Sequence, residues 1–200
     1  MNPVIPGMLA SLSYVVGAAI QFLPASGKQA VKVVGLTAII LHGVTSYLSF
    51  YSEDGFDLGL YSMLSLSGLA VAAIVLISSL RRPLDNLFIV IFPLAAVTVV
   101  LDMALEGTYA LRPDISGGIA SHIILSIVAY GLLSVAAMQA LLLSFGDYEL
   151  KHHRLAIMKR LPPIETMDAL LFEMLGGGLV FLSLSILSGF VFLENIRDPG

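Results

Sequence analysis

The sequence has 200 residues, of which 58% are hydrophobic and only 12% are charged, and its mean hydropathy is +0.95. Soluble domains carry about 25% charged residues, so this composition excludes an ordinary soluble protein and indicates an integral membrane protein. The absence of cysteine excludes disulfides, thiolate metal sites and thioether attachment to this chain, and a net charge of -4 without a Lys/Arg-rich tract does not favour nucleic-acid binding.

Six apolar segments approach or exceed the roughly 20 residues that a helix needs to cross the hydrocarbon core. They cover about Val4–Leu23, Val31–Phe50, Leu58–Leu80, Leu84–Leu105, Gly117–Phe145 and Leu170–Leu193. Apolar runs of this length without period-two alternation predict helices. The first segment lacks the basic n-region of a secretory signal, so it is expected to be a retained span. We therefore expect an all-α, polytopic transmembrane helix bundle of about six spans, formed as one domain over residues 1–200.

The joints between these segments alternate in charge. Basic residues mark the first joint (Lys28, Lys32), the third joint (Arg81, Arg82) and the fifth joint, about Gly146–Ala169. Because positively charged joints stay on the cytoplasmic side, these three joints are expected in the cytoplasm and both termini outside. In the fifth joint, Glu149–Arg160 is expected to extend a helix, and Ile164–Phe172 to begin the last span.

Two histidines, His42 and His122, lie inside long apolar spans. An imidazole at membrane depth is costly unless it has a partner or a function. His42 is expected roughly 12 Å below the outer end of its span at 1.5 Å per residue, and His122 lies about five residues from the outer start of its own span. Because these two spans run in opposite directions, both rings are expected in the outer half of the bilayer, facing each other within the bundle.

The functional interpretation of this pair is axial ligation of the iron of haem b by both imidazoles. Arg112, in the outer joint just before the fifth span, is then expected to pair with a haem propionate. The structural alternative is that each histidine only hydrogen-bonds a neighbouring helix, and the spacing is equally compatible with it. Asp102, near the outer end of the fourth span, is expected at the interface, with orientation of a histidine as the second interpretation.

Several short segments resemble a known family. They are Ser121-His122, Ala129-Tyr130, Gln139–Leu143, Leu161–Met167, Leu170–Phe172, Arg82–Leu87 and Phe92–Ala96. Together, across essentially the whole chain, they resemble the YpjD-like inner-membrane proteins of the cytochrome c assembly superfamily, which handle haem (CcsA/CcmC type).

This resemblance implies a multi-pass protein of the bacterial inner membrane that serves cytochrome c biogenesis by presenting haem at the outer face. Its partners would be haem, the lipid bilayer and other cytochrome c assembly proteins. The family-type histidines correspond to His122 and to His42. The sequence departs from the family in having no tryptophan, whereas the haem transporters carry a tryptophan-rich outer loop. This branch is expected to have about eight spans, with a further histidine after the point where this sequence stops.

Two other functions compete with haem handling. One is a non-catalytic scaffold or regulator that recruits a cytoplasmic partner through the basic 146–169 joint. The other is a small-solute transporter or channel, against which the sequence shows no pair of broken helices in corresponding halves. We do not expect an enzyme, because the sequence has no His-Glu-x-x-His motif and no convincing nucleophile-base set.

Overall fold

The computed structural model describes residues 3–21, 27–52, 55–81, 84–105, 117–151 and 164–197. Its elements, in chain order, are α1 (Val4–Ile20), α2 (Gly27–Phe50), β1 (Tyr51–Ser52), β2 (Gly55–Phe56), α3 (Leu60–Ser79), the 3-10 turn η1 (Asp85–Leu87), α4 (Phe88–Ala104), α5 (Gly117–Lys151) and α7 (Ile164–Arg197). The two short strands form an antiparallel pair after α2. All other described elements are helical, so the predicted all-α bundle is confirmed.

The described helices follow the predicted apolar segments closely. Four of them, α2, α3, α5 and α7, are long and apolar enough to cross a membrane, while α1 and α4 are shorter apolar helices of 17 residues each. The helices enter the predicted fifth joint from both sides, because α5 continues to Lys151 and α7 already begins at Ile164. The number of spans and the outward position of the termini stay predictions.

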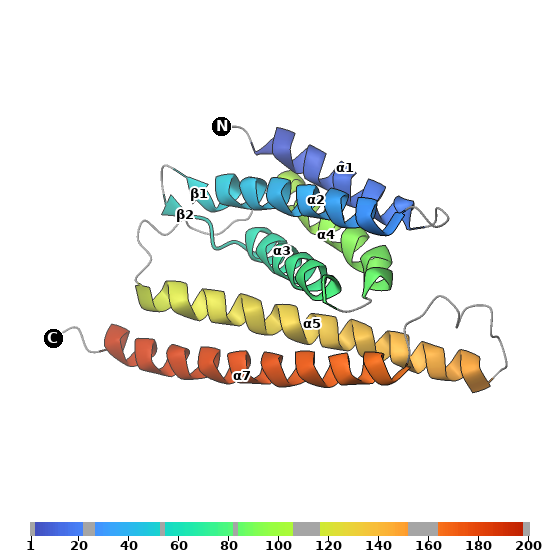
Figure 1. Cartoon of the computed structure of the whole chain (residues 1–200). Helices are drawn as coiled ribbons and strands as arrows, with labels where there is room; N and C mark the ends of the chain where they lie inside the picture. Colours follow the sequence, from blue (N-terminus) through green and yellow to red (C-terminus); the bar gives the residue numbers. More distant parts are fainter. Residues whose placement is uncertain are drawn as a thin grey trace.

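The helices form two groups that are joined by α3. In the first group α1 packs along α2 and α4, and α3 packs against α4 and α2. In the second group α5 and α7 run side by side along most of their length, and α5 also packs against α3. Figure 1 shows α3 between α2 and α5, with successive helices running in opposite directions. The strand pair, the start of α5 and the end of α7 lie at one end of the molecule, here called the hairpin end.

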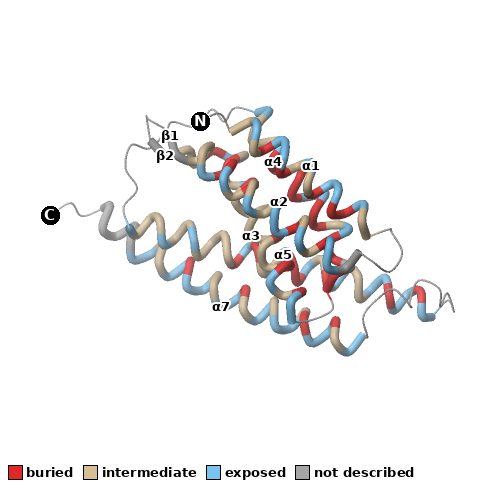
Figure 2. The backbone as a smooth tube through the Cα atoms, turned by 45° about the horizontal axis from the view of Figure 1, so that its top comes forward, coloured by how far each residue is buried: buried red, intermediate tan, exposed pale blue. Residues whose placement is uncertain are grey.

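Most of the buried hydrophobic residues that the structure describes lie in the first group. Figure 2 shows buried positions gathered on the facing sides of α1, α2 and α4, whereas α7 is largely exposed. Phe88 and Phe92 of α4 stack at 4.6 Å between ring centroids, and the Tyr14 ring lies 5.4 Å from Phe92. All three side chains are fully buried. Large apolar side chains on α7, such as Phe190 at 68% exposure, point away from the protein, as expected of a surface that contacts lipid.

Polar contacts bind the joints together at the end opposite the hairpin end. The Lys32 ammonium lies 3.4 Å from the Asp85 carboxylate and donates to the Ser79 carbonyl at 2.7 Å. The Gln21 side chain donates to the Asp85 carbonyl at 2.9 Å. Residues from α1, α2, α3 and η1 therefore meet in one polar cluster, which holds the first group in register.

The contact between α5 and α7 depends on close approach at Gly178. A Cβ atom added at Gly178 would lie 2.8 Å from Cγ of Leu133, whereas one added at Gly176 would meet no atom within 4 Å. Gly178→Ala is therefore expected to lower the free energy of unfolding by about 1–3 kcal/mol through overpacking. Thermal unfolding of the detergent-solubilised protein measures this change. Gly176→Ala is the matched control, and equal melting temperatures for the two variants would contradict the proposed close packing.

Candidate functional site

His42 lies in the middle of a buried hydrogen-bonded chain across three helices. Its Nδ1 is 3.2 Å from the Tyr14 hydroxyl of α1, and its Nε2 is 3.0 Å from the Ser65 hydroxyl of α3. The Tyr14 ring also meets the imidazole edge-on, with 5.8 Å between centroids. In a neutral imidazole one nitrogen donates and the other accepts, and a hydroxyl serves either role. Both ring nitrogens of this fully buried histidine are therefore engaged by neighbouring helices.

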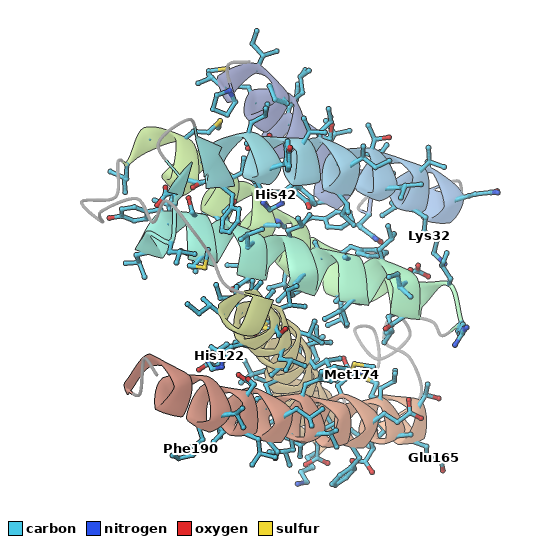
Figure 3. The ribbon with its side chains drawn as sticks, turned by 90° about the vertical axis from the view of Figure 1, so that its left-hand side faces the viewer. Lys32, His42, His122, Glu165, Met174 and Phe190 are labelled. Carbon is cyan, nitrogen blue, oxygen red and sulfur yellow. The ribbon has the colours of Figure 1, made fainter. Side chains whose placement is uncertain are left out.

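His122 lies at a different interface, between α5 and α7. Its Nδ1 is 2.9 Å from the Ser185 carbonyl oxygen and 3.2 Å from the Ser188 hydroxyl oxygen, both on α7. Gly189 leaves room for the ring, because a Cβ atom there would lie 3.3 Å from Cε1 of His122. The side chain is half-buried. Figure 3 shows His122 beside α7 and His42 in the layer formed by α2 and α3.

The surroundings of His122 determine which ring nitrogen carries the proton. A carbonyl oxygen only accepts hydrogen bonds, so the bond to Ser185 requires a proton on Nδ1. The Ser188 hydroxyl already donates its single hydrogen to the same carbonyl at 2.7 Å, so it too faces Nδ1 as an acceptor. A neutral His122 therefore keeps its lone pair on Nε2. Histidines that ligate metals are commonly oriented through this bond from the other ring nitrogen.

The structure does not bring the two histidines together. The His42 ring is bonded to α1 and α3, whereas the His122 ring is bonded to α7, and α3 lies between α2 and α5. The expectation that the two rings face each other across one porphyrin-wide gap is therefore wrong. The error has a physical cause: similar depth along antiparallel spans does not fix the direction in which each helix turns its side chain.

Other predicted residues are placed as follows. Arg112 lies outside the described residues, so its pairing with a propionate stays a prediction. Asp102 lies near the end of α4 and accepts a hydrogen bond from the Ser62 hydroxyl at 3.0 Å.

In the described ranges, no group of three or more His, Cys, Asp or Glu side chains is arranged to hold a metal ion. Half of the basic 146–169 joint, residues 152–163, also lies outside these ranges, and no described contact favours the scaffold function.

Sequence reasoning missed the partners of both histidines. Tyr14 is a phenol in a largely apolar helix, and small residues such as Gly7, Ala10 and Gly17 share its buried side. That arrangement is a signal for an inward-facing hydrogen-bonding group. The α7 partners carry a weaker signal, because Ser185 and Ser188 are two of several serines in that span.

The His42 chain makes a prediction about stability. Ser65→Ala would leave the buried Nε2 of His42 without its hydroxyl partner, which is expected to cost about 1–3 kcal/mol of unfolding free energy. Ser67→Ala is the control, since the Ser67 hydroxyl donates to the Met63 carbonyl of its own helix at 2.8 Å. Chemical unfolding in mixed micelles gives both values. A Ser65 variant as stable as the Ser67 variant would mean that the bond to His42 contributes nothing.

The amino-acid sequence was compared with those of known proteins and protein families. Residues 27–196 match the family model described as cytochrome C assembly protein. The sequence is 27% identical over 144 residues to the inner membrane protein YpjD of Escherichia coli strain K12, and to the proteins of that name from strains O6:H1 and O157:H7. Each alignment covers 72% of this chain and 55% of the relative, so the chain spans about half the length of these relatives.

No solved structure matches significantly. The names of the relatives and the apolar helices together confirm the predicted multi-pass location in the inner membrane. The family match extends over most of the chain, including α2 to α7 and both intramembrane histidines. The chain therefore belongs to the cytochrome c assembly family.

Proposed function

We propose that this protein binds haem b within the inner membrane and presents it for cytochrome c biogenesis, with His122 as a ligand of the iron. Family membership supports the pathway. The observation that carries the haem site is the bond from His122 Nδ1 to the Ser185 carbonyl, because it leaves the Nε2 lone pair for a metal.

The position of His122 suits an amphipathic cofactor. It lies five residues after the start of α5, which corresponds to about 7.5 Å along a helix. Haem is largely apolar but carries two carboxylates, so iron bound at this depth would leave the carboxylates near the membrane surface. Arg112, five residues before α5 begins, is the proposed partner of one propionate. With the predicted topology, this site opens toward the outer face.

His42 fits a structural role better than iron ligation. Both of its nitrogens have hydroxyl partners, and the ring is fully buried among α1, α2 and α3. Ligating a metal would require breaking a buried hydrogen bond and leaving a hydroxyl unpaired, which costs about 1–3 kcal/mol. We therefore assign haem binding to His122 and interhelical hydrogen bonding to His42.

In the proposed role the chain binds its cargo and makes no covalent bond to it. Bound haem would supply an iron centre that accepts the imidazole nitrogen. Residues of this chain would orient that nitrogen, shield the porphyrin between apolar helices and pair with its carboxylates. Other assembly proteins in the membrane would receive the haem.

Haem titration of the purified protein tests this proposal. Wild type is expected to give a shifted Soret band, and His122→Ala to bind at least about tenfold more weakly, because an iron ligand is lost. His42→Gln and His153→Ala are the controls, and each is expected to bind as wild type does. Helical circular dichroism verifies that all four proteins are folded.

Two results would contradict the assignment. Equal affinities for wild type and His122→Ala would remove His122 from the site. Loss of the Soret shift in folded His42→Gln, with His122→Ala unaffected, would transfer the ligand role to His42.

A further inference from the structure

At the hairpin end, one serine hydroxyl lies between two carboxyl groups. The Ser62 hydroxyl oxygen of α3 is 3.0 Å from Oδ2 of Asp57 and 3.0 Å from Oδ1 of Asp102. Asp57 belongs to the joint that precedes α3, and the Gly59 amide holds its other oxygen at 2.7 Å. Asp102 reaches the same hydroxyl from the last turn of α4.

The number of hydrogens in this contact is informative. A serine hydroxyl carries one hydrogen and therefore donates one hydrogen bond, while ionised carboxylates only accept. Ser62 can thus satisfy one carboxylate, and the second oxygen at 3.0 Å forms a hydrogen bond only if its own carboxyl is protonated. For both 3.0 Å contacts to be hydrogen bonds, one of the two carboxyl groups must carry a proton in addition to the hydroxyl hydrogen of Ser62.

The surroundings of Asp102 also favour a shared proton. Its second carboxyl oxygen, Oδ2, is buried and has no hydrogen-bond partner among the described residues. A fully ionised carboxylate in lipid would need compensation by a cation or by donors. The Lys32 side chain does not compensate it, because it lies at the opposite end of α2 and pairs with Asp85.

Further hydroxyl groups connect this pair to His42. Ser65 and Ser49 lie beside the Asp102 carboxyl, and Ser65 also bonds Nε2 of His42. An independent observation comes from Ser46 of α2. Its hydroxyl is buried, with 3% of the residue exposed, and has no partner among the described residues. Ser46 lies one helical turn after His42 and three residues before Ser49, so it shares the face that meets Asp102.

We propose that Asp57, Ser62 and Asp102 bind one proton and carry it from the membrane surface to the interior beside His42. In the transfer, the O–H bond of Asp57 breaks and its proton forms a new O–H bond with the Ser62 oxygen. At the same time the original O–H bond of Ser62 breaks, and that proton moves to Asp102. The result is an ionised Asp57, a protonated Asp102 and an unchanged serine. Ser65 then links this site to the imidazole of His42.

Among the described residues, the titratable groups linked to the site come from α1, α2, α4 and the joint before α3. They are Asp57 before α3, Asp102 of α4, His42 of α2 and Tyr14 of α1. The proton site is independent of the proposed haem site, which lies at the α5–α7 interface. Failure of haem binding would therefore leave this inference intact, and the reverse also holds.

Infrared spectroscopy of the full chain in lipid nanodiscs at neutral pH tests the inference. Wild type is expected to show the carbonyl band of one protonated carboxylic acid, which shifts on transfer to D2O. Asp57→Asn and Asp102→Asn should each lose the band, because the remaining single carboxylate accepts from Ser62 and ionises. Asp168→Asn, at an exposed position of α7, is the matched control and should keep it.

Three outcomes would overturn the inference. The wild-type spectrum is recorded in Na⁺ buffer and in a buffer in which choline replaces Na⁺, and the band could be absent from both. The band could survive in either folded Asp→Asn variant, which would show that the proton is not shared. A band absent in Na⁺ and present after replacement of Na⁺ by choline would assign the site to a sodium ion. The wild-type measurements remain decisive even if Asp102→Asn fails to fold.

Discussion

Lipid cannot hydrogen-bond polar side chains, so a polar group inside this bundle is stabilised only by partners within the protein, on its own helix or on a neighbouring one. His42 meets this requirement twice, through Tyr14 of α1 and Ser65 of α3, and thereby links three helices at one depth. His122 meets it through the backbone of α7. The same constraint explains why the two rings turn to different interfaces. It also explains why α3, which supplies hydroxyl groups to the first group and a packing surface to α5, holds the whole structure together.

The helices could be predicted from the sequence because the cost of exposing backbone polar groups to lipid leaves few alternatives for long apolar runs. Their ends could not be predicted from hydropathy alone, although the sequence did predict a helical extension from Glu149 and the start of the last span at Ile164. Hydropathy reports where a segment leaves the lipid, whereas a helix ends where its backbone bonding ends. The α5 helix thus continues past Phe145 to Lys151, and α7 begins at Ile164, before its apolar stretch starts.

The candidate site could also be predicted only in part from the sequence. The sequence identifies His42 and His122 as unusual residues and places them at similar depth, since depth depends only on counting along a helix. It does not determine which helix each ring meets, because that depends on how all the helices rotate and pack. Tyr14 and Ser185 orient the two rings, and the Ser185 carbonyl also fixes the proton of His122 on Nδ1; both residues come from segments distant in sequence. His42 thus matches the structural alternative, in which a histidine only hydrogen-bonds neighbouring helices. His122 also makes such a bond, but it keeps a lone pair on Nε2.

The length of α5 has a consequence for the residues that it connects. Its 35 residues correspond to about 52 Å, whereas the hydrocarbon core is about 30 Å thick. The α5 helix packs along α7 over most of its length and continues beyond the start of α7 in Figure 1. Asp147 and Lys151, which form a 2.7 Å ion pair in the last turns of this helix, are thus joined by unbroken helix to His122 near its start.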